Sequence, residues 1–171
     1  MAKPFYQSPI HNVLFKEEQG FTQWYIWLLL FVILLIPGYG IIQQMILEVP
    51  FGDNPMSNLG LIVFLIGMLL LCLFFWKLKM RTIITRDHLY IKFKPLANKR
   101  IRWKDVASAE IVKYSPMIGY GMRFSPLYGT VYNVKGRKGL ALKLKNGKKL
   151  MIGTQRYREI EDVALGVLRR M

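Results

Sequence analysis

Hydrophobic and polar residues follow two different patterns along the 171-residue chain. Residues 24–47 and 58–76 are continuous apolar segments without a charged residue. As α-helices they would be about 36 and about 28 Å long, which is enough to cross the hydrocarbon core of a bilayer. From Met80 onward apolar and polar residues alternate, as they do in half-buried β-strands. The pattern predicts two transmembrane helices followed by a β-rich domain.

The segments around the two apolar stretches define the rest of the membrane part. Residues 48–57 between them are rich in turn formers, which predicts an antiparallel hairpin around a short extracytoplasmic loop. Residues 1–23 form a leader, in which Val13–Phe15 and Phe21 flank a charged centre. This arrangement predicts a short interfacial helix. A cleaved signal peptide is disfavoured, because the first apolar segment is too long and Glu17 and Glu18 precede it.

The charges next to the helices predict the orientation of the hairpin. The loop 48–57 contains no Lys or Arg, whereas Lys77, Lys79 and Arg81 follow the second helix directly. Positive charge near a membrane segment stays on the cytoplasmic side, so both termini are expected in the cytoplasm. Tryptophan is enriched where a helix meets the membrane surface. The expected interface anchors are Trp24, Trp27 and Trp76.

The apolar segments themselves resemble an anchor more than a channel. Neither contains an Asp, Glu, Lys, Arg or His, and such residues usually mark an ion path. Pro37 predicts a kink in the first helix, which leaves open a hinge or a simple packing feature. Gly60 and Gly67 are seven residues apart on one helix face, which predicts that the two helices approach closely there.

Residues 77–171 are predicted to form a cytoplasmic α+β domain. Residues 81–85 and 89–94 are expected to form a hairpin, with Leu89, Ile91 and Phe93 pointing inward. Residues 140–145 and 148–152 flank Asn-Gly, the strongest short hairpin signal. The chain then closes with an amphipathic helix, expected to begin at Thr154 as its N-cap. In all, about seven short antiparallel strands with a C-terminal helix as cap are expected.

This order of strands and helix resembles the bacterial pleckstrin-homology-like (PH-like) domains. The resemblance rests on TIITRDHLYIKF, IRWKDVASAEIV and LALKLKNGKKLMIGTQRYREIEDVALGVL, and it covers roughly residues 81–170. A two-helix hairpin before such a domain is similar to a group of uncharacterised bacterial membrane proteins. The resemblance implies a β-sandwich or barrel, a place in the bacterial cytoplasmic (inner) membrane, and no catalytic motif. The stretches Gly119–Arg123 and Tyr132–Gly136 fall outside the family pattern.

Charge is concentrated in this domain and changes the functional picture. The formal net charge of the chain is +15, from 25 basic and 10 acidic residues. Residues 1–76 contain two of the basic and four of the acidic residues, so residues 77–171 have a surplus of 17 positive charges. Solubility of a small domain needs a net charge of only about 2–8, which indicates a basic surface that docks on anionic lipid headgroups or an acidic protein partner. The candidate contact residues are Lys77, Lys79, Arg81, Arg86, Lys92, Lys94, Arg100, Arg102, Lys143, Lys145, Lys148 and Lys149.

The residues needed for catalysis are scattered, so the sequence favours a protein that is not an enzyme. The two histidines, His11 and His88, lie far apart in the sequence, and Cys72 lies within an apolar segment. No Cys/His set has zinc spacing, and no cofactor or small-molecule substrate is expected. The main alternative is an accessory subunit of a larger membrane complex, with a membrane-protein partner or a second copy of the chain. Nucleic-acid binding is disfavoured, because no recognition motif accompanies the basic residues.

Overall fold

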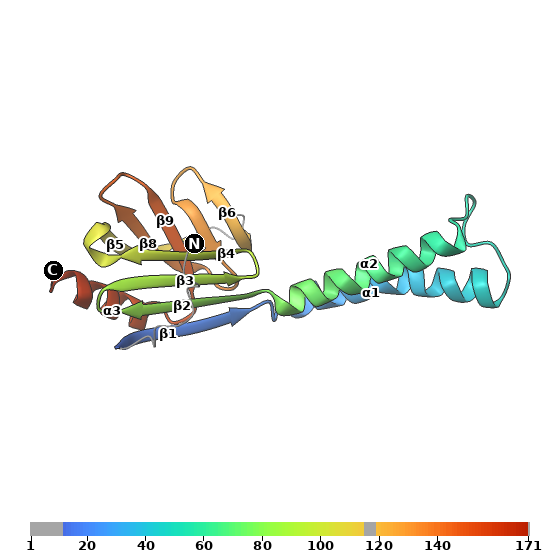
Figure 1. The fold of residues 1–171 in the computed structure, drawn as a ribbon, viewed down its shortest axis with the longest axis horizontal. Helices are drawn as coiled ribbons and strands as arrows, with labels where there is room; N and C mark the ends of the chain where they lie inside the picture. Colours follow the sequence, from blue (N-terminus) through green and yellow to red (C-terminus); the bar gives the residue numbers. More distant parts are fainter. Residues whose placement is uncertain (1–11, 115–118, 171) are drawn as a thin grey trace, which may run out of the picture. The chain divides into compact units, whose positions relative to one another are not determined.

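The structure is a computed structural model that describes residues 12–114 and 119–170. The first eleven residues of the expected leader, including His11, lie outside the described residues. The same is true of Ile118, with which the Gly-rich segment 118–124 begins, a segment that the sequence predicts to form a short strand. The chain divides into two compact units. We call Phe21–Leu78 the helical unit, and Met1–Gly20 with Lys79–Met171 the β unit. The helical unit is therefore inserted into the sequence of the β unit (Figure 1).

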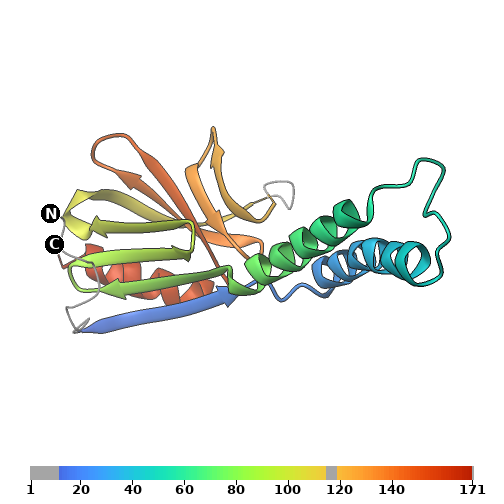
Figure 2. The same ribbon diagram turned by 45° about the vertical axis from the view of Figure 1, so that its right-hand side comes forward.

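The helical unit consists of two long apolar helices. Helix α1 (Trp24–Ile41) contains Pro37 and continues as the π-helical η1 (Ile42–Ile46), and α2 is Asn58–Lys77. Both are long and apolar enough to cross a membrane. Only 17% of the most apolar stretch of the first and 11% of that of the second are buried, so most of their apolar surface is exposed. The two helices lie side by side as an antiparallel pair (Figure 2).

The two helices approach each other closely at Gly40. A Cβ atom added there would lie 3.3 Å from Cδ2 of Leu61 in α2. A Cβ at Gly67 would meet nothing within 4 Å, and one at Gly60 would meet the side chain of Met56, which precedes α2. The predicted packing role of Gly60 and Gly67 is therefore wrong. Their spacing places them on one face of a helix but does not determine which face meets the partner helix.

The β unit contains two sheets and a helix, which confirms the α+β class. Within the described residues only β7 and β9 pair in parallel, and the other strand pairs are antiparallel. Sheet A has the order β1-β2-β3-β4, with β1 (Val13–Gly20), β2 (Lys79–Thr85), β3 (His88–Lys94) and β4 (Ala97–Arg102). Sheet B has the order β5-β8-β9-β7-β6, with β5 (Val106–Lys113), β6 (Gly121–Ser125), β7 (Gly129–Asn133), β8 (Lys138–Leu144) and β9 (Lys149–Thr154). The short 3-10 helix η2 is Trp103–Asp105, and helix α3 (Tyr157–Leu168) contacts β1, β5 and β8.

The core of the β unit is formed by alternate residues of the strands. Leu89, Ile91 and Phe93 are fully buried, which confirms their predicted inward direction. Trp103 in the short 3-10 helix η2 is also fully buried, and its indole Nε1 donates a hydrogen bond to the Thr85 carbonyl oxygen at 3.1 Å. The buried aromatic side chain thereby has a partner for its polar atom.

Several sequence predictions about the β unit need correction. The expected interfacial helix is strand β1, and the described residues form nine strands in place of about seven. Two of the inward positions of β1, Glu17 and Gln19, are polar, so the alternation that marks a strand is hidden in the sequence. Thr154 is the last residue of β9, and the N-cap of α3 is Arg156. Strand β4 begins at Ala97, within residues 95–99, for which the sequence predicts a turn.

Candidate functional site

The register of sheet A places most of its cations on one face. Residues directly opposite each other in adjacent strands point to the same side, and successive rows alternate between the two sides. Lys79 lies opposite Gly20 and Lys94, and Arg81 lies opposite Glu18 and Lys92. The rows between them hold the buried core residues, so the cations point away from the core. This outer face carries Lys16, Lys79, Arg81, Lys92, Lys94, Arg100 and Arg102.

One acidic residue accompanies these seven cations in the described rows of the outer face. The Glu18 carboxylate accepts hydrogen bonds from Nε and Nη2 of Arg81 at 2.9 and 2.5 Å, and Lys79 Nζ lies 4.0 Å away. The hydrogen bond from Arg81, assisted by the charges of Lys79 and Lys16, holds the pKa of Glu18 below its usual value. Glu18 is therefore ionised at neutral pH, and the outer face keeps a large positive surplus.

Arg100 on this face is held by two aromatic neighbours. Its Nη2 atom lies 2.8 Å from Nε2 of His88, and its Cζ atom lies 5.5 Å from the centre of the Tyr90 ring. Burial of the imidazole, followed by the charge of Arg100, lowers the pKa of His88. A neutral imidazole can accept the hydrogen bond from the guanidinium, so the geometry and the protonation state agree.

A second basic surface is a cleft of about 990 Å³ along the edge of sheet A. We call it the edge cleft. It runs from β4 to the turn between β8 and β9 and to the link between β6 and β7. Lys99 shares a register row with the buried residues Ile91 and Thr82, yet it is exposed because β4 is the edge strand. The cations that line the cleft are Lys99, Arg100, Arg102, Lys145, Lys148 and Lys149, and Asp105 is the acidic residue among its described lining.

Two glycines shape the walls of the edge cleft. Gly147 has φ +80° in the predicted Asn-Gly turn, which the hydrogen bond from Leu144 N to the Lys148 carbonyl closes at 2.8 Å. Gly129 has φ +66°, and a Cβ atom there would collide with the backbone carbonyl of Lys149. Glycine therefore permits the close approach of β7 to β9.

The rim of the edge cleft also has an apolar part. Phe124, which lines the cleft, is 78% exposed, and Leu127 in the link between β6 and β7 is 70% exposed. The ammonium group of Lys149 donates a hydrogen bond to the Leu127 carbonyl at 3.2 Å, which fixes this link against β9. The cleft thus combines positive charge with large exposed apolar side chains.

The structure divides the candidate residues that the sequence grouped as one basic surface. Lys79, Arg81, Lys92 and Lys94 lie in the three register rows nearest to Gly20, where the chain leaves the β unit. Arg100 and Arg102 lie toward the other end of β4, and Arg86 lies in the turn after β2. Lys145, Lys148 and Lys149 line the edge cleft. Lys143 pairs with Lys149 but is not part of the cleft lining, and Lys77 is the last residue of α2 in the helical unit.

Three residues of these surfaces were missed in the list predicted from sequence. Lys16 belongs to the outer face only because the leader forms a strand, and Lys99 belongs to the cleft only because β4 is an edge. Phe124 directly follows the stretch Gly119–Arg123, which falls outside the family pattern. The one sequence signal for Phe124 as a surface residue is its position between the polar residues Arg123 and Ser125.

The predicted tryptophan anchors share one end of the helical unit. Trp24 and Trp76 are 73% and 67% exposed, and Trp27 Nε1 donates a hydrogen bond to the Phe21 carbonyl at 2.8 Å. The rings of Phe21 and Phe75 meet edge to face at 5.7 Å, which brings the start of α1 and the end of α2 together. At the opposite end, Gln44 fastens the loop through hydrogen bonds to the Met56 carbonyl and the Asn58 side chain, both 2.7 Å long.

The described residues contain no group of three or more His, Cys, Asp or Glu side chains that could hold a metal ion. Cys72 lies partly exposed in α2, and His88 binds Arg100 on the outer face. Comparison of the chain with protein-family models and with curated protein sequences found no match.

Proposed function

We propose that this chain is a non-enzymatic integral membrane protein of the bacterial inner membrane, with both termini in the cytoplasm. In this proposal the helical unit crosses the membrane as a hairpin, with Trp24, Trp27 and Trp76 at the inner interface. The β unit is a PH-like domain that docks on anionic lipid headgroups through the outer face of sheet A. The apolar, largely exposed surface of both helices supports the membrane part of the proposal.

The observation that supports docking is the concentration of cations in the register rows of sheet A that begin with the Gly20–Lys79 pair, where the chain leaves the β unit. Gly20 and Lys79 are paired in the ladder, three residues separate Gly20 from the start of α1 at Trp24, and only Leu78 separates Lys77 from Lys79. Such short connections keep the first rows of sheet A within reach of the lipid surface. These rows present Lys79, Lys94, Arg81 and Lys92.

The expected strength of docking follows from these charges. Each Lys or Arg near an anionic leaflet contributes about 1 kcal/mol, and the attraction falls off within a Debye length of about 8 Å at physiological salt. Several cations on one flat face can therefore hold the β unit against the membrane, whereas isolated cations elsewhere add little. Docking of this kind weakens at high salt.

A residue-resolved experiment tests the proposal on the full chain. The protein is placed in nanodiscs of phosphatidylcholine alone or with added phosphatidylglycerol, and the acetylation rate of each lysine is measured by mass spectrometry. We expect Lys79, Lys92 and Lys94 to react at least about threefold more slowly in the anionic nanodiscs, and this protection to disappear at about 0.5 M salt. Lys145 and Lys148 are the matched controls and should react equally in both.

Equal rates for all five lysines in the two kinds of nanodisc would overturn docking on anionic lipid. An accessory subunit predicts a different result. It would show no dependence on lipid charge, and a stoichiometric membrane-protein partner would co-purify with it in mild detergent.

A further inference from the structure

We propose that the edge cleft binds an extended acidic segment of a partner protein, which adds as a strand beside β4. The edge cleft shares Arg100 and Arg102 with the outer face of sheet A, but its occupant would pair with the edge of β4, and the proposal does not depend on lipid docking. The proposal rests on the size of the cleft, the free edge of β4 and the charge of the lining.

The edge cleft is too large and too elongated for a single ion. Its volume of about 990 Å³ is at the upper end of the range for ligand sites, about 300–1,000 Å³. Four successive residues of β4, Lys99–Arg102, line it, so it follows the direction of the strand. An extended chain fits this shape, whereas one phosphate group would occupy a small part of it.

The edge of β4 offers the backbone groups that strand addition needs. In the described part of sheet A, β4 pairs with β3 alone. Its other side therefore presents unpaired N–H and C=O groups, which an added strand can satisfy. A second copy of β4 is a poor occupant, because pairing would bring Lys99, Arg100 and Arg102 of the two chains next to one another.

The charge of the cleft specifies an acidic partner. Asp105 already binds Arg102, with Oδ2 2.9 Å from Nε. Among the described residues, no carboxylate forms an ion pair with Lys99, Lys145 or Lys148. Acidic side chains at alternate positions of a bound segment would pair with these lysines, while an apolar side chain between them could cover the exposed ring of Phe124.

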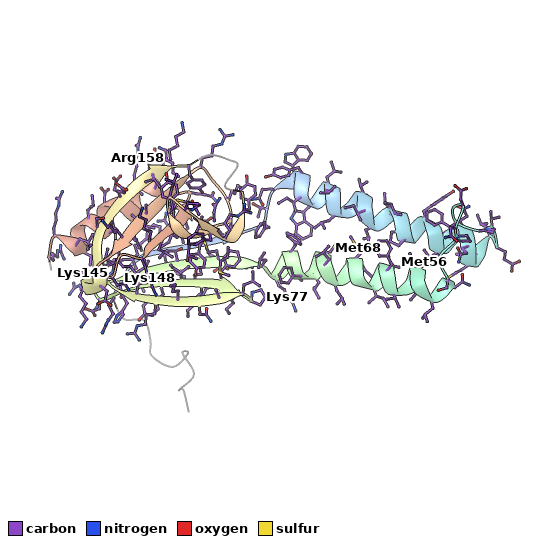
Figure 3. The ribbon with its side chains drawn as sticks, turned by 90° about the horizontal axis from the view of Figure 1, so that it is seen from above. Met56, Met68, Lys77, Lys145, Lys148 and Arg158 are labelled. Atoms are coloured by element: carbon purple, nitrogen blue, oxygen red, sulfur yellow. The ribbon has the colours of Figure 1, made fainter. Side chains whose placement is uncertain are left out.

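Lys145 and Lys148, in the turn between β8 and β9, lie at the end of the β unit that is open to a soluble partner. Arg102 is in the register row farthest from the Gly20–Lys79 row, and Lys145 N donates a hydrogen bond to the Asp105 carbonyl at 2.9 Å. Lys145 and Lys148 accordingly lie together at one end of the β unit, on a different side from Arg158 (Figure 3). A partner that approaches from the aqueous phase can reach this end even when the first rows of sheet A contact lipid.

The test uses the full chain in nanodiscs of neutral lipid at about 0.15 M salt, where charges more than about 8 Å apart are screened. The probe is a fluorescent octapeptide of alternating Glu and Val, and binding is measured by anisotropy. We expect saturable binding that K145E/K148E weakens at least about tenfold, a loss of about 1.4 kcal/mol. The matched control K92E/K94E, on the outer face, should change it less than about twofold.

Two further probes separate strand addition from charge alone. The same peptide is N-methylated either at its Glu or at its Val residues, and only one of the two versions should lose binding, because alternate backbone groups of an added strand face β4. Equal binding of both versions, or equal losses for the two double variants, would overturn the proposal. Binding of tripolyphosphate without binding of the peptide would also overturn it and would identify a phosphate site. Because the lipid is neutral, none of these results depends on lipid docking.

Discussion

Oγ1 of Thr154 donates a hydrogen bond to Oε2 of Glu17 at 2.5 Å, and 137 residues separate the two in the sequence. Oε1 of the same carboxylate accepts hydrogen bonds from the Gln155 backbone N–H at 2.9 Å and from Nε2 of Gln19 at 3.0 Å. Gln19 in turn donates to the Gly153 carbonyl at 2.9 Å. The first strand of the β unit is thus fastened to its last strand by a buried carboxylate, although the helical unit lies between them in the sequence.

The first prediction concerns this buried carboxylate. Glu17→Ala leaves the Thr154 hydroxyl and the Gln155 N–H without their acceptor, and hydrogen bonds to a charged group contribute about 1.5–3 kcal/mol. We expect the free energy of unfolding to fall by about 2–3 kcal/mol. Pulse proteolysis of the full chain in mild detergent across a urea series measures this loss.

Glu18→Ala is the matched control, one residue away on the opposite face of the same strand. It removes an exposed ion pair with Arg81, which is expected to contribute no more than about 1 kcal/mol. If the two variants lost equal stability, the hydrogen bonds of Glu17 would not be what holds β1 in place.

The second prediction follows from the pairing of Gly20 with Lys79. Their strands are adjacent and antiparallel, so a two-residue hairpin turn can join them in place of the helical unit. Replacing residues 21–78 by Asn-Gly should give a soluble, folded β unit with dispersed backbone NMR signals. Residues 79–170 alone lack β1 and the Glu17 contacts, and they should give the collapsed spectrum of a partly unfolded chain. Equal dispersion for the two proteins would show that β1 is dispensable.

The strands of the β unit differ in how far the sequence predicts them. β3 and the β8–β9 hairpin were predicted because Leu89, Ile91 and Phe93 alternate cleanly and because Asn-Gly marks the turn. β1 was missed because its inward side chains include Glu17 and Gln19, two polar residues whose hydrogen-bond partners include groups 134 and more residues away in the sequence. Local periodicity contains no information about such distant partners.

The basic surface also could be predicted only in part from the sequence. The number of cations predicted an anion-binding protein, but their division between the outer face and the edge cleft depends on register and on which strand lies at the edge. Lys99 and Arg100 are neighbours in the sequence, yet the side chain of Lys99 points to the core side of sheet A and that of Arg100 to the outer face. Sequence spacing could place them on opposite faces but could not show which face is covered by sheet B.

The third prediction concerns pH. Burial and the charge of Arg100 lower the pKa of His88 below its ordinary value of about 6.5. As the pH falls through that value, the unfolded chain takes up a proton that the folded chain still refuses, so the free energy of unfolding decreases between about pH 7 and pH 5. His88→Gln should show a smaller decrease in urea midpoint over this range. His11 is present in both proteins, so the difference between them reports His88, and parallel decreases would exclude a contribution from His88.

The fourth prediction concerns the orientation of the hairpin. Cys72 is the one cysteine of the chain, so Cys72→Ser provides a background in which single cysteines report their side of the membrane. In that background, N54C in the loop between the helices should react with a membrane-impermeant maleimide on intact cells, because the loop carries no Lys or Arg and is expected outside. R158C on α3 should react only after lysis, since the β unit follows the basic residues that stay in the cytoplasm. The reverse labelling would contradict the orientation, because it would place the lysines of the β unit at the outer leaflet. Release of the chain by a carbonate wash would show that the two apolar helices pack against protein and do not cross the lipid.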